Sequence, residues 1–98
     1  MSTVEDHAPP GGHVTLRYWA SAREAAGTDQ EALEVTGAVP LSDLVGRALR
    51  EHDSSRFSRV IDCCSVMVGD RPVTSHDLTT VMVAPGSTVE FLPPFAGG

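Results

Sequence analysis

Apolar and polar residues alternate along several short segments of the chain, which predicts strands. In the first segment Val14, Leu16 and Tyr18 share one face, and Trp19 points outward at the end of the strand. Similar extended patterns occur at residues 30–35, 64–68, 72–73, 81–83 and 88–92. Gly, Pro and Asp residues typical of turns separate most of these segments. We therefore expect a sheet of about five strands, each with one face toward the core.

The direction of the side chains follows from the alternation in each segment. Cys64, Val66 and Val68 are expected to face inward, and Val89 and Phe91 share one face of the last strand. In residues 30–35, Ala32 with Leu33 or Val35 is expected to mark a second strand. If the first and last strands are neighbours, Trp19 and Leu92 emerge on the face away from the helix.

A helical period predicts one main helix. Five apolar residues recur at spacings of three and four and so share one helical face: Leu41, Leu44, Val45, Ala48 and Leu49. Residues 20–27 predict a short Ala-rich turn, and residues 53–55 are expected to cap a second turn holding Phe57. The order of elements predicts an α+β fold, with a mixed sheet and the main helix on one face.

The two ends of the chain differ in composition from its middle. Residues 1–13 carry paired prolines and glycines with few large apolar side chains, so we expect a disordered tail. Residues 14–92 form the predicted domain. Pro93 and Pro94 stop the last strand because neither has an amide hydrogen. Residues 93–98 are then expected to form a flexible arm.

Length and charge exclude several classes of protein. The 98 residues suffice for one domain, and the net charge of −6 argues against nucleic-acid binding and against docking on an anionic membrane. All seven basic residues are Arg, so the chain offers no Schiff-base, P-loop or isopeptide-acceptor lysine. No segment resembles a signal peptide or a membrane span, and the expected location is the cytoplasm.

The candidates for conventional chemistry are few. Cys63 and Cys64 are adjacent, too close at Cα for an ordinary disulfide. Cys63 is expected to be exposed at the start of a strand and Cys64 to pack as a small apolar residue, although a redox or nucleophilic role stays open. His52 is expected to cap the main helix as a cation. No phosphate loop, triad or metal-ligand cluster is present, so no permanently bound cofactor or metal is expected.

The most informative feature is the ending Pro93-Pro94-Phe95-Ala96-Gly97-Gly98. Six extended residues reach roughly 20 Å, and glycine lets a backbone enter a narrow channel. The α-carboxylate of Gly98 is then the unusual reactive group of the molecule. Adenylation would convert this poor acyl donor into a mixed anhydride that a sulfur nucleophile could attack.

Three stretches resemble the small sulfur carriers of the MoaD/ThiS type: residues 19–27, residues 85–92 and the ending 93–98. This family has a ubiquitin-like β-grasp fold and ends in Gly-Gly, and the similarity covers nearly all of residues 14–98. The Arg-Glu pair followed by Gly, and the Pro-Pro-x-x-Gly-Gly ending, look most like the small subunit of molybdopterin synthase.

The resemblance implies a non-catalytic carrier. A ubiquitin-activating-like enzyme would use ATP to adenylate Gly98, sulfur transfer would form a thiocarboxylate, and the large synthase subunit would accept the tail. Gly97 would provide clearance in the channel. Trp19, Pro72 and Leu92 would form an apolar docking patch, with Phe95 as a further partner contact. Arg23 would make either a polar contact at the rim of the patch or a local salt bridge.

Two alternatives stay open. The same carrier chemistry could serve the biosynthesis of thiamine, cysteine or a sulfur-containing secondary metabolite. Alternatively, the chain could be a ubiquitin-like interaction domain, or a modifier joined to lysines of other proteins.

Overall fold

The computed structural model describes residues 12–94 and has the predicted α+β fold. The main sheet has the strand order β2-β1-β7-β4-β5. Its strands are β1 (Gly12–Tyr18), β2 (Gln30–Val35), β4 (Ser65–Val68), β5 (Arg71–Pro72) and β7 (Thr88–Leu92). Two further short strands, β3 (Val39–Pro40) and β6 (Met82–Val83), pair with each other. The sheet is mixed, because β1 and β7 run parallel while the other pairs are antiparallel.

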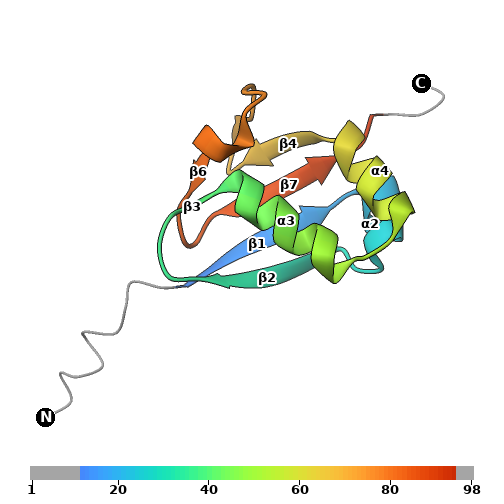
Figure 1. Ribbon diagram of the computed structural model, residues 1–98, viewed down its shortest axis with the longest axis horizontal. Coiled ribbons are helices and arrows are strands. Elements are labelled where there is room, and N and C mark those ends of the chain that lie inside the picture. Colours follow the sequence, from blue (N-terminus) through green and yellow to red (C-terminus); the bar gives the residue numbers. More distant parts are fainter. Residues whose placement is uncertain (1–11, 95–98) are drawn as a thin grey trace, which may run out of the picture.

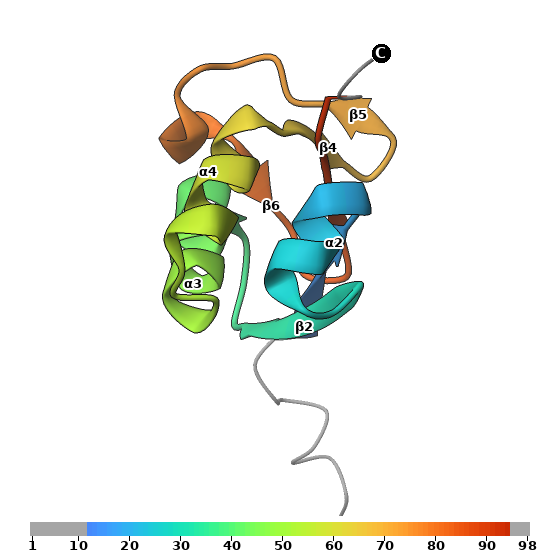
Figure 2. The same ribbon diagram turned by 90° about the vertical axis from the view of Figure 1, so that its right-hand side faces the viewer.

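Three α-helices accompany the sheet: α2 (Ala20–Ala26), α3 (Leu41–Glu51) and α4 (Ser55–Cys63). Figures 1 and 2 show α3 and α4 on the same side of the main sheet, with α2 at the end where β1 and β7 finish. The apolar face of α3 lies on the sheet as its period predicts, with Leu41, Leu44 and Ala48 buried. Within residues 12–94 no helix covers the opposite face of the sheet (Figure 2).

The core lies between the helices and the inner face of the sheet. Val14, Leu16 and Tyr18 of β1 and Val89 and Phe91 of β7 are buried there, which confirms the predicted direction of both strands. Within residues 12–94 no polar or charged residue is fully buried. The core is therefore an apolar layer, and the hydrophobic effect is its main source of stability.

The parallel pairing of β1 with β7 determines where the chain leaves the fold. Tyr18 is the register partner of Phe91, and the Trp19 amide donates to the Phe91 carbonyl over 3.2 Å. Gly12 and Leu92 thus lie at opposite ends of the sheet, as Figure 1 shows. The segment after Leu92 leaves beside Trp19.

Several boundaries differ from the predictions. β1 begins at Gly12, so the predicted tail 1–13 was too long by two residues, and residues 1–11 lie outside the described part. The predicted turn after residue 55 is the nine-residue helix α4, because Ser54 accepts a hydrogen bond from the Phe57 amide and caps it. The predicted extended piece 81–83 contains β6, and the residues just before it form a 3₁₀ helix, η1 (Leu78–Thr80), which Asp77 caps.

The strand predicted at residues 30–35 is confirmed, and its register with β1 decides which of its side chains face the core. Ala32 is exposed, whereas Glu31 and Leu33 are half-buried and Val35 is buried. The antiparallel register pairs Leu33 with the buried Val14 and therefore turns Leu33 toward the core. Residue 31 is acidic, and its inward position requires polar partners.

Those partners are Tyr18 and His52. The Tyr18 hydroxyl donates to Glu31 Oε2 over 2.5 Å, and His52 Nε2 lies 2.7 Å from the same oxygen. The His52 ring also packs against Phe57, with 4.8 Å between ring centroids. His52 is the C-cap residue of α3, which confirms the prediction, and its side chain has a further contact that the sequence did not indicate. Its side chain ties α3 to β2 by an ion pair when the imidazole is protonated.

The Tyr18 hydroxyl makes the fold sensitive to alkaline pH. Burial, the hydrogen bond to Glu31 and the charge of Glu31 raise the pKa of Tyr18 far above its ordinary value. The unfolded chain loses this proton near pH 10 whereas the folded chain keeps it, so the contribution to stability falls as pH rises above about 10. We expect the urea midpoint to decline less steeply above that pH in Tyr18→Phe than in the wild type. Equal slopes would contradict this assignment.

Candidate partner-binding site

The uncovered face of the sheet carries a row of register partners. Arg17 of β1 pairs with Glu90 of β7, Glu90 with Met67 of β4, and Met67 with Pro72 of β5. Partners in adjacent strands project to the same face, and neighbouring strands are about 4.8 Å apart. Val89 and Phe91 point to the core, so Glu90 and Leu92 lie on the opposite, uncovered face. This row crosses four strands.

Trp19 is held on this face by two polar neighbours. Its indole Nε1 donates to Glu90 Oε1 over 2.9 Å, and the Arg17 guanidinium carbon lies 4.7 Å from the centroid of its ring. Trp19 is also the N-cap residue of α2, and 40% of its surface is exposed. A large aromatic side chain fixed in one orientation and open to solvent is typical of an anchor residue in a protein interface.

Three predicted docking residues, Trp19, Pro72 and Leu92, therefore share one surface with Met67, and these four residues are here called the open-face patch. Pro72 is exposed at the edge strand, while Met67 and Leu92 are half-buried. Met67 was missed by the sequence reasoning, because its place between Glu90 and Pro72 depends on the β4–β7 register. Pro93 and Pro94 follow directly from this patch.

Not every predicted site residue belongs to the open-face patch. Arg23 is exposed on α2, and the side-chain contacts found within residues 12–94 include none that it makes. The local ion pair of α2 is made instead by Glu24 with Arg56 of α4, over 3.3 Å. Phe95, Gly97 and Gly98 lie outside the described residues, and so does most of the predicted arm 93–98.

The two cysteines have different environments. Cys63 is exposed as the last residue of α4, so the prediction that it starts a strand was wrong. Cys64 is half-buried, and its thiol donates to the Val60 carbonyl over 3.2 Å. Burial, with a smaller effect of Cys63, raises the pKa of Cys64 to about 11. Cys64 therefore packs as predicted and is a poor nucleophile at neutral pH.

We expect iodoacetamide at about pH 8 to label Cys63 at least about tenfold faster than Cys64, because the thiolate is the reacting species. Peptide mass spectrometry of the folded chain measures both rates. In concentrated urea the two cysteines should react similarly, which serves as the control. Equal rates in the folded chain would show that Cys64 is open to solvent.

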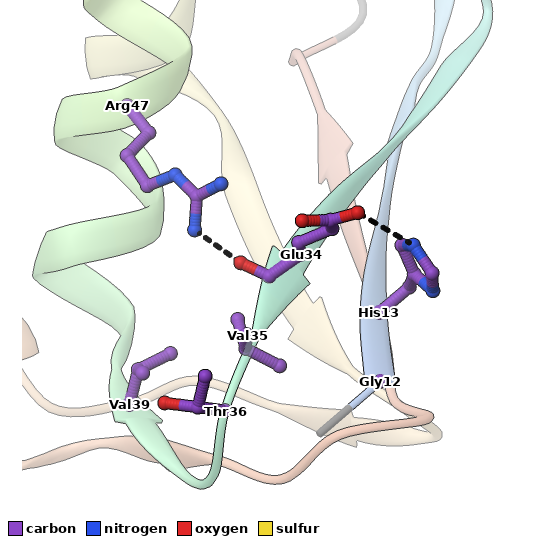
Figure 3. Close-up of a pocket in the computed structure, with 7 residues that line it drawn as sticks. All are labelled: Gly12, His13, Glu34, Val35, Thr36, Val39 and Arg47. Atoms are coloured by element: carbon purple, nitrogen blue, oxygen red, sulfur yellow. Dashed lines mark hydrogen bonds and ion pairs between the residues drawn. The ribbon is translucent and has the colours of Figure 1, made fainter. Parts of the chain in front are cut away.

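A separate cavity of about 520 Å³ lies at the other end of the sheet, between β2 and α3. Figure 3 shows Arg47 reaching across it, where Nη1 donates to the Glu34 backbone carbonyl over 2.8 Å. This contact satisfies a carbonyl at the sheet edge. Gly12, at the end of β1 farthest from Leu92, lines the cavity. The cavity is therefore not continuous with the open-face patch.

Other kinds of site find no support in the described part of the chain. Residues 12–94 contain no group of three or more His, Cys, Asp or Glu side chains placed to hold a metal ion. None of the helices in the same range has the length and apolar character needed to cross a membrane.

Solved structures with a similar fold come from several organisms. A Pyrococcus furiosus protein proposed to be molybdopterin converting factor, subunit 1, is 23% identical with a TM-score of 0.69, covering 86% of this chain and 99% of that one. Small archaeal modifier protein 1 of Haloferax volcanii is 20% identical with a TM-score of 0.69, over 86% and 99% of the two chains. No curated protein sequence matches the chain.

A further similar structure is a complex of subunits 1 and 2 of the molybdopterin-converting factor of Helicobacter pylori. It is 15% identical with a TM-score of 0.62, and covers 88% of this chain and 99% of that one. At these identities the likeness establishes the fold, which is the ubiquitin-like β-grasp.

The fold defines a small ubiquitin-like protein of the β-grasp class. The sequence matches the ThiS family over residues 16–98, and the chain belongs to that family. This confirms the MoaD/ThiS resemblance.

Proposed function

We propose that this protein carries sulfur as a thiocarboxylate on Gly98 and donates it in molybdopterin biosynthesis. The observation that carries the proposal is the position of Pro93 and Pro94, which follow β7 directly at the edge of the open-face patch. A partner that binds the patch would have the last residues directed toward it. Membership of the ThiS family over a range that includes Gly97 and Gly98 supports the same function.

The chemistry belongs to the terminal carboxylate and to partner enzymes. A carboxylate oxygen attacks the α-phosphate of ATP, pyrophosphate leaves, and an acyl-adenylate forms. A hydrosulfide equivalent then attacks the acyl carbon, and AMP leaves with the C–O bond electrons. The product is the thiocarboxylate. This chain supplies the acyl group and the docking surface, while the ATP site belongs to an adenylyltransferase of the ubiquitin-activating type.

The acceptor partner is proposed to be a molybdopterin synthase large subunit. The Helicobacter pylori complex of subunits 1 and 2 supports a partner of this kind, since its subunit 1 resembles this chain in fold. Loading and delivery are both expected in the cytoplasm. Carriers for thiamine or cysteine biosynthesis share the chemistry, so co-purification with a thiazole or cysteine synthase would redirect the proposal to those routes.

The intact mass of protein isolated from its own cells tests the carrier function directly. We expect a fraction of the molecules to show a sulfur-for-oxygen exchange confined to the C-terminal peptide. Its absence in cells that are actively making the cofactor, with only the carboxylate present, would contradict the proposal. Co-purification with the synthase large subunit would then test the pathway separately.

Trp19 should be the strongest contact of the open-face patch. We expect Trp19→Ala to weaken binding of the adenylyltransferase or the large subunit by about 2 kcal/mol, or about 30-fold, because an exposed aromatic anchor is lost. Isothermal titration calorimetry gives the two affinities. Arg50→Ala, an exposed change on α3, is the matched control and should bind normally. An unchanged affinity in Trp19→Ala would exclude the open-face patch as the docking surface.

A protein modifier is the second candidate, because small archaeal modifier protein 1 has a similar fold. In that case the activated Gly98 would be joined to a lysine amine of another protein. The chain contains no lysine and cannot be its own acceptor. Higher-mass adducts on other cellular proteins, resistant to reducing agents, would favour this function over sulfur transfer.

A further inference from the structure

The open-face patch continues into a hollow beside the last described residues, which shares Met67, Pro72 and Leu92 with it. It is a groove of about 740 Å³ between the end of α4, the start of β4 and the loop that leads to η1. Its apolar lining includes Ile61, Cys64, Val66, Leu78, Pro93 and Pro94. Strand β5 has only two residues, and they pair with Met67 and Val68 of β4. The first two residues of β4 therefore have no β5 residue beside them, and the groove lies at this part of the sheet.

The chain itself provides a suitable occupant. Pro94 lines the groove, and the next residue in the sequence is Phe95. One residue advances an extended chain by about 3.3–3.6 Å, so the Phe95 side chain is within reach of the groove wall. The ring is large and apolar, and burying it in an apolar groove is favourable. Two preceding prolines with restricted φ lower the conformational entropy that docking would cost.

We propose that Phe95 occupies this groove when no partner is bound and thereby holds the arm against α4 and β4. Resting on the proposed function, this contact would keep Gly98 close to the body until an enzyme docks on the open-face patch and extracts the arm. The competing occupant is an apolar side chain of a partner protein. In that case the groove of the free chain would stay empty of Phe95.

Nuclear magnetic resonance of the full-length labelled chain tests the docking. We expect nuclear Overhauser contacts from the Phe95 ring to the methyl groups of Val66 and Leu78 in the free protein. Phe95→Ala should remove these contacts and shift the backbone signals of the groove residues. Ala96→Ser alters the arm without removing the ring and is the matched control, for which the groove signals should stay in place.

Two results would overturn the proposal. One is the absence of these ring contacts, with Phe95→Ala shifting only residues of the arm. The other is groove signals that move only when a partner protein is added, which would assign the groove to that partner. The measurement involves no sulfur chemistry, so it can fail while thiocarboxylate is still found on Gly98. Docking can equally be seen in a chain that never carries sulfur.

Discussion

Deleting Gly98 is expected to abolish sulfur transfer completely while leaving the fold unchanged. The reacting carboxylate would then belong to Gly97, one residue short, and a displacement of the acyl carbon by about 3.5 Å removes it from a position suitable for attack. Residues 12–94 contain the whole of the described core, so the urea midpoint should not move. Thiocarboxylate formation with the purified adenylyltransferase, ATP and a sulfur source, followed by intact mass, measures the effect.

The matched controls compare one short tag at the two ends of the chain. A short tag before Met1 should leave sulfur loading normal, whereas the same tag after Gly98 should abolish it. A variant lacking Gly98 that still accepts sulfur at the wild-type rate would exclude the terminal carboxylate as the carrier group. An inert interaction domain would tolerate every one of these changes.

Replacing Phe57 by Ala is expected to lower the free energy of unfolding by about 3–5 kcal/mol. Phe57 is fully buried, and its ring lies 5.6 Å from Tyr18 and 4.8 Å from His52, between centroids. Truncation of the side chain would leave a cavity between α4 and the rings of Tyr18 and His52. Since a domain of this size has only about 5–15 kcal/mol of stability, the variant should be marginal at 37 °C.

Equilibrium urea unfolding followed by circular dichroism measures this change. Phe57→Leu keeps most of the side-chain volume and should lower the free energy of unfolding by less than about 1.5 kcal/mol. The difference between the two variants then reports the cost of the cavity. If Phe57→Ala cost no more than Phe57→Leu, α4 would have to be collapsing onto the sheet to fill the space. Val60→Ala, which is half-buried on the same helix, gives an intermediate reference.

Most strands and the main helix were predictable because their signals are local. The directions of Val14, Leu16 and Tyr18, and of the apolar face of α3, follow from backbone geometry that repeats every two or 3.6 residues. The outward position of Trp19 followed in the same way. The facing of β2 was left open by the sequence because its alternation is weak, with the acidic Glu31 half-buried and Ala32 exposed.

The contacts between distant elements were not predictable by this reasoning. Tyr18, Glu31 and His52 come from β1, β2 and the end of α3. Tyr18 was predicted to face inward, but Glu31 alone is typical of a surface residue and His52 of a capping residue. Met67 looked like an ordinary strand residue until the register of β4 with β7 placed it beside Glu90. Pairing of this kind depends on which strands become neighbours, and no periodicity within one segment encodes that.

The sequence by itself determined the carrier hypothesis, because two prolines and two glycines at the end of the chain act through their own backbone chemistry. It also determined the local elements and the family resemblance. Only the tertiary structure decided that Trp19, Met67, Pro72 and Leu92 share one uncovered face, and that a groove adjoins Pro94. The reason is physical: a surface is made by side chains from separate strands, and their positions exist only once the sheet has formed.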